Sequence, residues 1–271
     1  MERIKQALDK ARTERETSGS PTPVASDLAQ SAGPPIADAS IQYSQTKIRK
    51  LDPAVLQNNR VIYGESDRVG LTAYKMLRTQ VLQRMTARSW NALAITSPAP
   101  EDGKTLTAIN LAISLARELH HTVLLVDMDL RNPSIHKYFG IQPDTGIDDY
   151  LLRGASMSDV LVNPGIERLV LLPGKKAIEN SSEILASPAM GRLVHELKTR
   201  YPARMVLFDL PPILSADDAL SFAPFVDAFL LVLRDGKTSR SELENAMEIL
   251  KDATILGTVL NGSDEKISAY Y

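Results

Sequence analysis

Three consecutive residues, Gly103, Lys104 and Thr105, have the types and the order that a phosphate-binding loop requires. They close a loop between an apolar segment that begins at Leu93 and a helical pattern that continues to Leu115. In such a loop, backbone N–H groups at the start of the helix surround an anion. The lysine reaches the β- and γ-phosphates of a nucleotide, and the threonine hydroxyl binds Mg²⁺. The stretch LAITSPAPEDGKTLTAINLAISL therefore indicates nucleoside triphosphate chemistry.

Two features of this loop depart from the G-x-x-x-x-G-K-[ST] pattern. Pro98 stands where the pattern has its first glycine, and Glu101 and Asp102 bring two carboxylates beside the expected phosphate position. A GKT tripeptide also arises by chance in proteins that bind no nucleotide. The loop alone therefore leaves two interpretations open, a phosphate site and a turn without chemistry.

Three further acidic residues follow apolar runs, as the carboxylates of a nucleotide site do. Asp127 and Asp129 end the run HTVLLVDMDL, and Asp209 ends the strand-like MVLFD. With the lysine and the threonine they complete the set that a nucleoside triphosphate and Mg²⁺ require. A DxD pair alone is most often a solvated turn, and D-x-P-P alone most often ends a strand. Their occurrence after successive apolar runs favours one shared site.

The elements that would position these residues alternate between strands and helices. Short apolar runs predict strands at residues 93–96, 121–130, 169–172, 204–210, 228–233 and 255–260. Helical spacing predicts helices at residues 67–85, after Lys104, over 147–162 as a short pair, at 182–200, around 219–222 and at 242–251. This alternation predicts an α/β fold, a doubly wound, mainly parallel sheet flanked by helices. Ligands of such sheets bind outside the carboxyl ends of the strands, where all the motifs fall.

Composition excludes some chemistry and places few limits on partners. The 271 residues are 44% hydrophobic and 24% charged with a net charge of −2, which gives no electrostatic reason to expect nucleic acid or a membrane surface as a partner. The absence of cysteine excludes thiol catalysis and fits a cytoplasmic protein. No segment approaches the roughly 20 apolar residues of a membrane span, so we expect a partner to hold the chain at any membrane where it acts.

We expect three parts along the chain. Residues 1–58 would form a short amphipathic helix, either marginal or a docking helix, and then a disordered linker rich in Ser, Pro and Ala. Residues 59–261 would form the nucleotide-binding domain. Residues 262–271 would form a short flexible C-terminal tail that ends in Tyr270 and Tyr271, two aromatic residues with no core to join.

At these motifs the sequence resembles the bacterial tyrosine kinases, the BY-kinases of the CpsD/CapB type. VLLVDMDLRNPSIH resembles their Walker A′ motif, and MVLFDLPP resembles their Walker B motif. The similarity extends from about Tyr63 to Asn261 and includes AYKMLRTQ, ENSSEILASP, FDLPPILSADDA and VDAFLLVLRDGKTSRSE. Its pattern is most like that of the exopolysaccharide- and exosortase-associated autokinases. These belong to the deviant P-loop class, which also contains the MinD and ParA ATPases.

The resemblance implies an ATP-dependent autokinase that phosphorylates tyrosines in its tail and controls the chain length and export of a polysaccharide. It implies ATP and Mg²⁺ as cofactors and a membrane-embedded chain-length regulator, of the co-polymerase type, as partner. The chain would then lie in the cytoplasm, at the inner face of the plasma membrane. MinD and ParA proteins carry a second lysine early in the loop, where this chain has Ala99, and that absence favours the kinase branch.

Each motif then has a candidate role. A tyrosine hydroxyl has a pKa of about 10, so a carboxylate should accept its proton, and Asp127 is the candidate base. Arg131 would either neutralise phosphate charge or hold the acidic loop by a salt bridge. The catalytic candidates are Lys104, Asp127, Asp129, Arg131 and Asp209, and the Mg²⁺ ligands among the candidates are Thr105, Asp129 and Asp209. The nucleotide-binding candidates are Pro100, Glu101, Asp102, Gly103, Lys104, Thr105, Leu106 and Asn261, the last at the position where related proteins contact adenine. The phosphoacceptor candidates are Tyr270 and Tyr271.

Two departures from the family pattern define the alternatives. Glu101 replaces a glycine of the family loop P-G-E-G-K-[ST], and its side chain would either turn to solvent or cripple the site. In the preceding helix, BY-kinases carry an E-x-x-R-x-x-R ridge for ring assembly, whereas this chain has Thr72, Lys75 and Arg78, of which only the last matches. Self-association is therefore an open hypothesis. The alternatives to a kinase are a catalytically weak nucleotide-sensing scaffold and a MinD/ParA-like ATPase switch.

Overall fold

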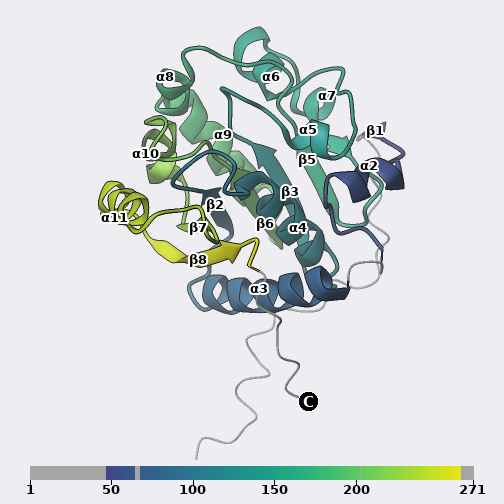
Figure 1. Ribbon diagram of the computed structural model, residues 1–271. Coiled ribbons are helices and arrows are strands. Elements are labelled where there is room, and N and C mark those ends of the chain that lie inside the picture. Colours follow the sequence, from purple (N-terminus) through teal and green to yellow (C-terminus); the bar gives the residue numbers. More distant parts are fainter. Residues whose placement is uncertain (1–46, 65–67, 202, 264–271) are drawn as a thin grey trace, which may run out of the picture. The chain divides into compact units, whose positions relative to one another are not determined.

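The strands predicted from apolar runs form one sheet in the computed structural model, which describes residues 47–64, 68–201 and 203–263 (Figure 1). Its strand order is β1-β4-β5-β3-β6-β2-β7-β8, and all neighbouring pairs are parallel except β4 and β5. The strands are β1 (Lys47–Ile48), β2 (Ala92–Thr96), β3 (Thr122–Asp127), β4 (Val162–Asn163), β5 (Leu169–Leu172), β6 (Arg204–Asp209), β7 (Ala228–Arg234) and β8 (Ile255–Asn261). The predicted α/β fold with a doubly wound, mainly parallel sheet is confirmed.

Helices cover both faces of this sheet, because successive side chains of a strand point to opposite faces. Leu93 and Ile95 of β2 belong to one apolar core, whereas Ala92 and Ala94 belong to the other. The first core is closed by α2 (Pro53–Asn58), α3 (Arg68–Thr86), α4 (Lys104–Ala116) and α5 (Ile135–Tyr138). The second is closed by α6 (Ile147–Arg153), α7 (Met157–Val160), α8 (Ser181–Leu185), α9 (Pro188–Thr199), α10 (Asp218–Phe222) and α11 (Arg240–Ile249), with the short 3-10 turn η2 (Ala223–Phe225). The two helix layers are visible in Figure 1.

Burial explains why the central elements lack polar faces. In β2 every residue is buried, since β6 and β7 flank it and helices cover both of its faces. Helix α4 is buried over its whole length except at Leu106. A continuous apolar run is the pattern that such doubly covered strands need, which is why the sequence identified them.

The predicted helix over residues 182–200 is wrong in one respect, because it is two helices. Helix α8 ends at Leu185, and α9 begins at Pro188. The Ser187 hydroxyl accepts a hydrogen bond from Met190 N at 3.2 Å, so Ser187 caps a new helix. Proline has no N–H with which to continue the preceding helix, and it is well placed in the first turn of the next one.

The folded structure also begins before the boundary expected at residue 59. Strand β1 and helix α2 lie in the stretch assigned to the linker. Asp52 caps α2 by accepting a hydrogen bond from Ala54 N at 2.9 Å, Pro53 begins the helix, and Leu56 is buried in the core. Six residues are too few to show helical periodicity, so the pattern missed them.

Two other predictions concern residues that the structure does not describe. The amphipathic helix at the N-terminus and the tyrosines Tyr270 and Tyr271 lie outside the described residues. Among the helices that are described, none is both long and apolar enough to cross a membrane.

Candidate active site

Three neighbouring strands carry the predicted chemistry to one edge of the sheet. Strand β6 lies between β3 and β2. In the pairing register Asp209 of β6 stands opposite both Asp127 of β3 and Ile95 of β2. Because these strands run parallel, the loop after β2, the acids after β3 and Asp209 all lie at their carboxyl ends. The structure therefore brings the three motifs together.

Lys104, the first residue of α4, links the acids of two strands. Its Nζ donates a hydrogen bond to Asp129 Oδ2 at 2.7 Å and lies 3.5 Å from Asp209 Oδ1. Thr105 Oγ1 donates to Asp209 Oδ2 at 2.7 Å. Burial alone would lower the pKa of Lys104, yet the carboxylates of Asp209, Asp129 and Asp127 hold that pKa above its usual range. The lysine is thus a cation that the surrounding acids fix in place.

Asp127 and Asp209 are fully buried and only partly hydrogen-bonded. Asp127 Oδ2 accepts hydrogen bonds from Ser134 N at 2.9 Å and Ile135 N at 3.0 Å. The Oδ1 atoms of both acids have no hydrogen-bond partner within the described part of the chain. Burial raises the pKa of Asp127 to about 7 and that of Asp209 to about 6, and the neighbouring carboxylates add to both shifts. Asp209 Oδ1 still faces Lys104 Nζ at 3.5 Å, but neither Oδ1 atom is used by a hydrogen bond among the described residues, so both are suited to receive a cation or a proton.

The oxygen atoms at this edge fit a Mg²⁺ ion that arrives with a nucleotide. Mg²⁺ prefers oxygen ligands, and phosphates and water usually supply most of them. The described residues contain no group of three or more acidic or histidine side chains arranged to hold a metal by themselves. The Thr105 hydroxyl and Asp209 Oδ1, which accepts no hydrogen bond within the described residues, provide oxygen atoms of the kind that a nucleotide-bound Mg²⁺ needs from the protein. Both oxygens of Asp129 are engaged, by Lys104 and by Asn132 N.

Gly103 and Asn261 shape the phosphate loop. Gly103 has φ +96°, and a Cβ on it would stand 1.9 Å from Asn261 Nδ2. Only glycine therefore fits at this position. Asn261 Nδ2 donates to Asp102 O at 2.8 Å, so Asn261 braces the loop as well as lining the pocket beside it.

The two carboxylates of the loop point away from the phosphate position. Glu101 adopts φ +65°, its side chain is 82% exposed, and its Oε2 lies 2.9 Å from Lys237 Nζ. The hydrogen bond and charge of Lys237 hold the pKa of Glu101 below its usual range. Asp102 is buried and accepts hydrogen bonds from Ala99 N at 3.0 Å and Thr238 Oγ1 at 3.2 Å. Of the two outcomes predicted for Glu101, a side chain turned to solvent or a crippled site, the structure shows the side chain turned to solvent.

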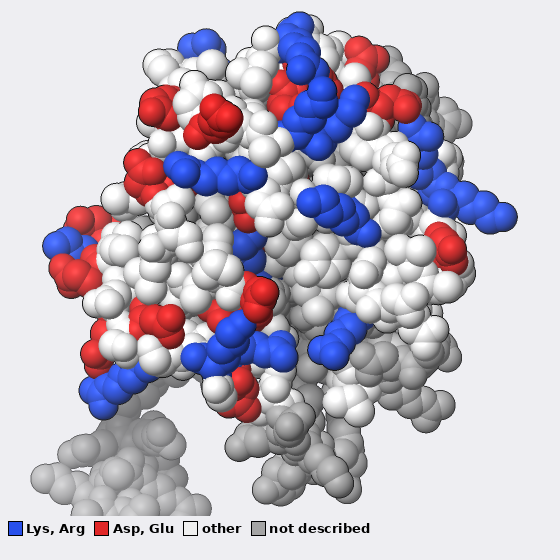
Figure 2. Space-filling view, turned by 45° about the horizontal axis from the view of Figure 1, so that its top comes forward, with Lys and Arg blue, Asp and Glu red and all other residues white. Residues whose placement is uncertain are grey.

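A pocket of about 790 Å³ opens over this edge, within the range typical of small-molecule sites. The candidate residues that line it are Pro100, Glu101, Gly103, Lys104, Thr105, Leu106, Asp129, Arg131 and Asn261. Asp102, Asp127 and Asp209 do not line it, and their side chains are buried. In Figure 2, Lys and Arg side chains gather around a hollow near the centre of the face, as suits a surface that receives phosphates.

Arg131 lines the pocket and is held by the first residue of α10. Its guanidinium pairs with Asp218 Oδ1, at 3.1 Å from Nε and 3.0 Å from Nη2. Asp218 is buried and also accepts a hydrogen bond from Ser181. Of the two roles predicted for Arg131, the structure shows the salt bridge, but its partner follows β6 and is not part of the DxD loop.

Sequence reasoning missed several residues of the pocket wall. They are Asn58, Asn59, Arg60, Asn132, Ser134, Tyr138, Pro211, Pro212, Ser215, Ala216 and Arg234. Arg234 ends β7, so the strand-end argument that found the acids applies to it equally. Tyr138 packs on the core and also lines the pocket. Nothing in the sequence distinguishes Asn59 or Arg60, which fall at the edge of the expected linker.

Comparison with known proteins identifies the family of this chain. Tyrosine-protein kinase YwqD of Bacillus subtilis is 32% identical over 217 residues, which cover 79% of this chain and 90% of YwqD. This chain belongs to the bacterial tyrosine kinase family. No protein-family model matches it.

Solved structures show the same relationship. The kinase domain of the Escherichia coli tyrosine kinase ETK matches with a TM-score of 0.65 and 28% identity, over 74% of this chain and 80% of that one. The cell division ATPase MinD of Pyrococcus furiosus matches with a TM-score of 0.54 and 26% identity, over 64% of this chain and 73% of MinD. The resemblance to BY-kinases and their kinship with the MinD and ParA ATPases are confirmed.

Proposed function

We propose that this chain is a protein-tyrosine autokinase that transfers the γ-phosphoryl group of ATP to Tyr270 and Tyr271. The cluster that Lys104 forms with Asp129 and Asp209 is the observation that carries the proposal. It places a fixed cation, a hydroxyl and buried acids where a nucleotide phosphate would bind. Membership of a family of tyrosine kinases supports the same reaction.

The residues of the loop would bind and orient the triphosphate. Backbone N–H groups at the start of α4 would surround the β-phosphate, and Lys104 Nζ would turn from Asp129 toward the β- and γ-phosphates. Thr105 and Asp209, assisted by Asp129, would hold Mg²⁺. When bound, Mg²⁺ neutralises the charge that develops on the phosphate oxygens. Asn261 would face the nucleoside from the end of β8.

Asp127 would accept the proton of the acceptor tyrosine. The phenol oxygen attacks the γ-phosphorus, the bond between the γ-phosphorus and the β-bridging oxygen breaks, and ADP leaves. The phenol proton passes to Asp127 Oδ1, the carboxylate oxygen without a partner among the described residues. A pKa of about 7 suits a base that works near neutral pH.

Intact-mass measurement after incubation with ATP and Mg²⁺ tests this proposal. We expect a gain of one or two phosphoryl groups on Tyr270 and Tyr271, and Lys104→Met or Asp127→Asn should abolish it. Phosphate found only on serine, or no phosphate at all even with the partner present, would contradict the proposal. Release of ADP without phosphotyrosine would favour the ATPase switch, to which the similarity with MinD points.

A membrane-embedded chain-length regulator of polysaccharide synthesis is the proposed partner. It would recruit the kinase to the inner face of the plasma membrane, since the described helices include none able to cross it. Adding the cytoplasmic part of such a regulator should speed autophosphorylation. An unchanged rate over a wide range of regulator concentrations would count against this partner.

A further inference from the structure

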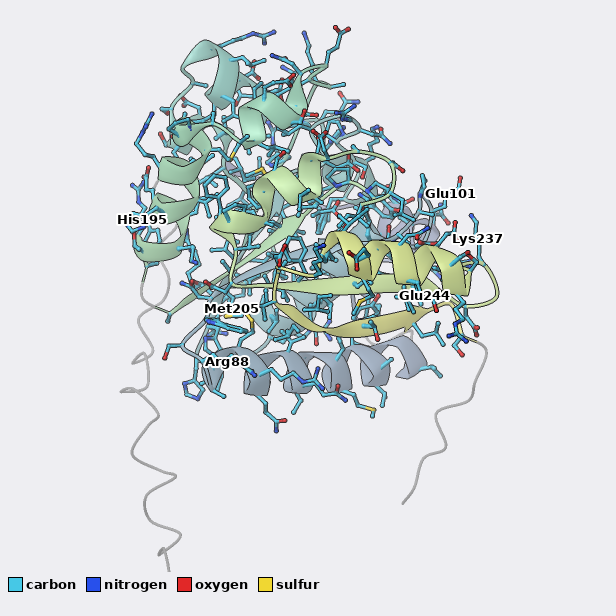
Figure 3. All side chains as sticks on the ribbon, turned by 90° about the vertical axis from the view of Figure 1, so that its left-hand side faces the viewer. Arg88, Glu101, His195, Met205, Lys237 and Glu244 are labelled. Carbon is cyan, nitrogen blue, oxygen red and sulfur yellow. The ribbon has the colours of Figure 1, made fainter. Side chains whose placement is uncertain are left out.

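The turn between β7 and α11 holds the phosphate loop through two side chains. Lys237 Nζ lies 2.9 Å from Glu101 Oε2, and Thr238 Oγ1 donates to Asp102 Oδ1 at 3.2 Å. Thr238 is itself fixed, because its Oγ1 accepts a hydrogen bond from Arg234 N at 2.7 Å. Figure 3 places Glu101 and Lys237 together at one edge of the molecule. The turn and the loop therefore form one unit, although they are far apart in the sequence.

Glu101 brings a negative charge and a strained backbone conformation to a site that we propose binds polyphosphate. It lines the pocket, and its left-handed backbone conformation is one that residues other than glycine rarely adopt. Its carboxylate would repel phosphates if it turned inward, because charges at short range in a partly dry pocket interact strongly. Its side chain is exposed, so packing does not hold it outward. The contact that its carboxylate does make is the ion pair with Lys237.

We propose that Lys237 is a positioning residue, which holds the Glu101 carboxylate out of the phosphate pocket and offsets its charge. This inference rests on the proposed function, because it assumes that the pocket binds ATP. Both side chains of the pair are largely exposed, and exposed ion pairs contribute little to stability. The effect of Lys237 should therefore appear in nucleotide binding and not in folding.

The test compares the loss of Lys237 in two backgrounds, by titrating MgATP into wild type, Lys237→Ala, Glu101→Gln and the double variant. Lys237→Ala should weaken binding about fivefold while Glu101 is present, and less than about twofold in the Glu101→Gln background. The loss of MgATP affinity caused by Lys237→Ala should be smaller in high salt, which screens the charge of Glu101. Lys237→Arg keeps the positive charge and should bind MgATP about as tightly as wild type does. In Lys237→Ala the KM for ATP should rise while kcat stays unchanged. Once ATP is bound, its phosphates exclude the Glu101 carboxylate from the pocket, so the chemical step is the same as in wild type.

Lys251→Ala is the matched control, because Lys251 forms a similarly exposed pair with Glu248 at 3.0 Å. It should leave MgATP binding unchanged, and thermal unfolding should show that all variants fold. An equal loss in both backgrounds would overturn the inference, because Lys237 would then act on the phosphates directly. Unchanged binding by Lys237→Ala would also overturn it. A wild-type protein that bound no MgATP would instead overturn the proposed function, and the inference with it.

Discussion

At the scale of single residues, Glu101 decides whether the loop is impaired. Its carboxylate pairs with Lys237, so it adds little negative charge to the pocket. Its cost lies in the backbone, because a left-handed conformation costs a residue with a Cβ about 1 to 2 kcal/mol. The scaffold alternative assumes that this residue weakens catalysis, and the exposed side chain is the orientation for which we predict the smaller effect on nucleotide binding.

Glu101→Gly should therefore change stability more than function. Relief of the strained backbone should raise the free energy of unfolding by about 1 kcal/mol, less what the ion pair contributed. The rate of autophosphorylation should change by less than about fivefold. Urea unfolding and intact-mass kinetics measure the two effects. A gain in rate of about tenfold or more would mean that the wild-type carboxylate reaches the phosphates after all.

If Asp127 is the proposed base, we expect it to reduce the stability of the protein. It is buried, one of its oxygens has no partner among the described residues, and its pKa is raised to about 7. Without nucleotide and metal, Asp127→Asn should stabilise the protein by about 1 to 2 kcal/mol at about pH 8, because a buried charge is removed. The same substitution should abolish phosphorylation.

The stabilisation by Asp127→Asn should depend on pH, because the pKa of Asp127 is raised in the folded protein. The pKa of Asp127 is higher in the folded protein than in an unfolded chain, so folding is accompanied by proton uptake between about pH 4 and 7. The contribution of wild-type Asp127 to stability therefore becomes less favourable as the pH rises to about 7. The gain from Asp127→Asn should be smaller at about pH 5.5 than at about pH 8 in urea unfolding with EDTA. An equal gain at both values would show that Asp127 is ionised throughout.

At the scale of elements, helix α4 supports the pocket on two sides. Its first turn carries Lys104, and Asn110 further along the helix holds the segment after α2. Asn110 Oδ1 accepts a hydrogen bond from Ile62 N at 2.8 Å, and its Nδ2 donates to Arg60 O at 3.1 Å. Asn59 Nδ2 donates to Tyr138 O at 3.0 Å and ties the same segment to α5. This segment of the pocket wall is thus fixed to α4, whose first turn carries Lys104.

Asn110→Ala should loosen that wall. The backbone N–H of Ile62 and the backbone C=O of Arg60 would lose their hydrogen-bond partners. This loss should lower the free energy of unfolding by about 2 kcal/mol. Amide exchange at Ile62 should become faster, whereas exchange in β2 should follow only the global change. Thr79→Ala, on the exposed side of α3, is the control and should change stability by less than about 0.5 kcal/mol. A similarly small effect of Asn110→Ala would show that the segment is held by its apolar contacts alone.

The helices and strands also show which features could be predicted from the sequence and which could not. Asp127 and Asp209 could be placed together from sequence, because strands buried on both faces are recognisable and parallel strands end at one edge. The division between α8 and α9 was readable in Ser187–Pro188, a helix start that the longer periodicity hid. The pair of Glu101 and Lys237 was not readable, since no periodicity relates residues 136 positions apart. Contacts of that kind depend on how loops pack after the sheet has formed.

At the scale of the whole molecule, the helix that BY-kinases use for ring assembly is engaged internally. Arg78, the one ridge position that matches the family, has its Nη2 2.8 Å from Glu118 Oε1, and its Nη1 donates to Ser114 O at 3.2 Å. Its side chain is only 17% exposed. It joins α3 to the end of α4 and leaves little of its guanidinium for another chain. We therefore expect light scattering with ATP and Mg²⁺ to give the mass of one chain, against the hypothesis of self-association.

A single chain should then phosphorylate itself. Asn261 lines the pocket and Tyr270 follows nine residues later, a length that spans up to about 30 Å when extended, so the tail is long enough to return to its own site. Intact-mass kinetics should give a rate per molecule that stays constant over a roughly hundredfold dilution. Lys104→Met chains mixed with wild type should gain little phosphate, because an acceptor on another molecule must compete with a tethered one at millimolar effective concentration. A rate proportional to protein concentration, with equal labelling of Lys104→Met chains, would instead require transfer between molecules. Helix α3 would then again be the candidate surface for self-association.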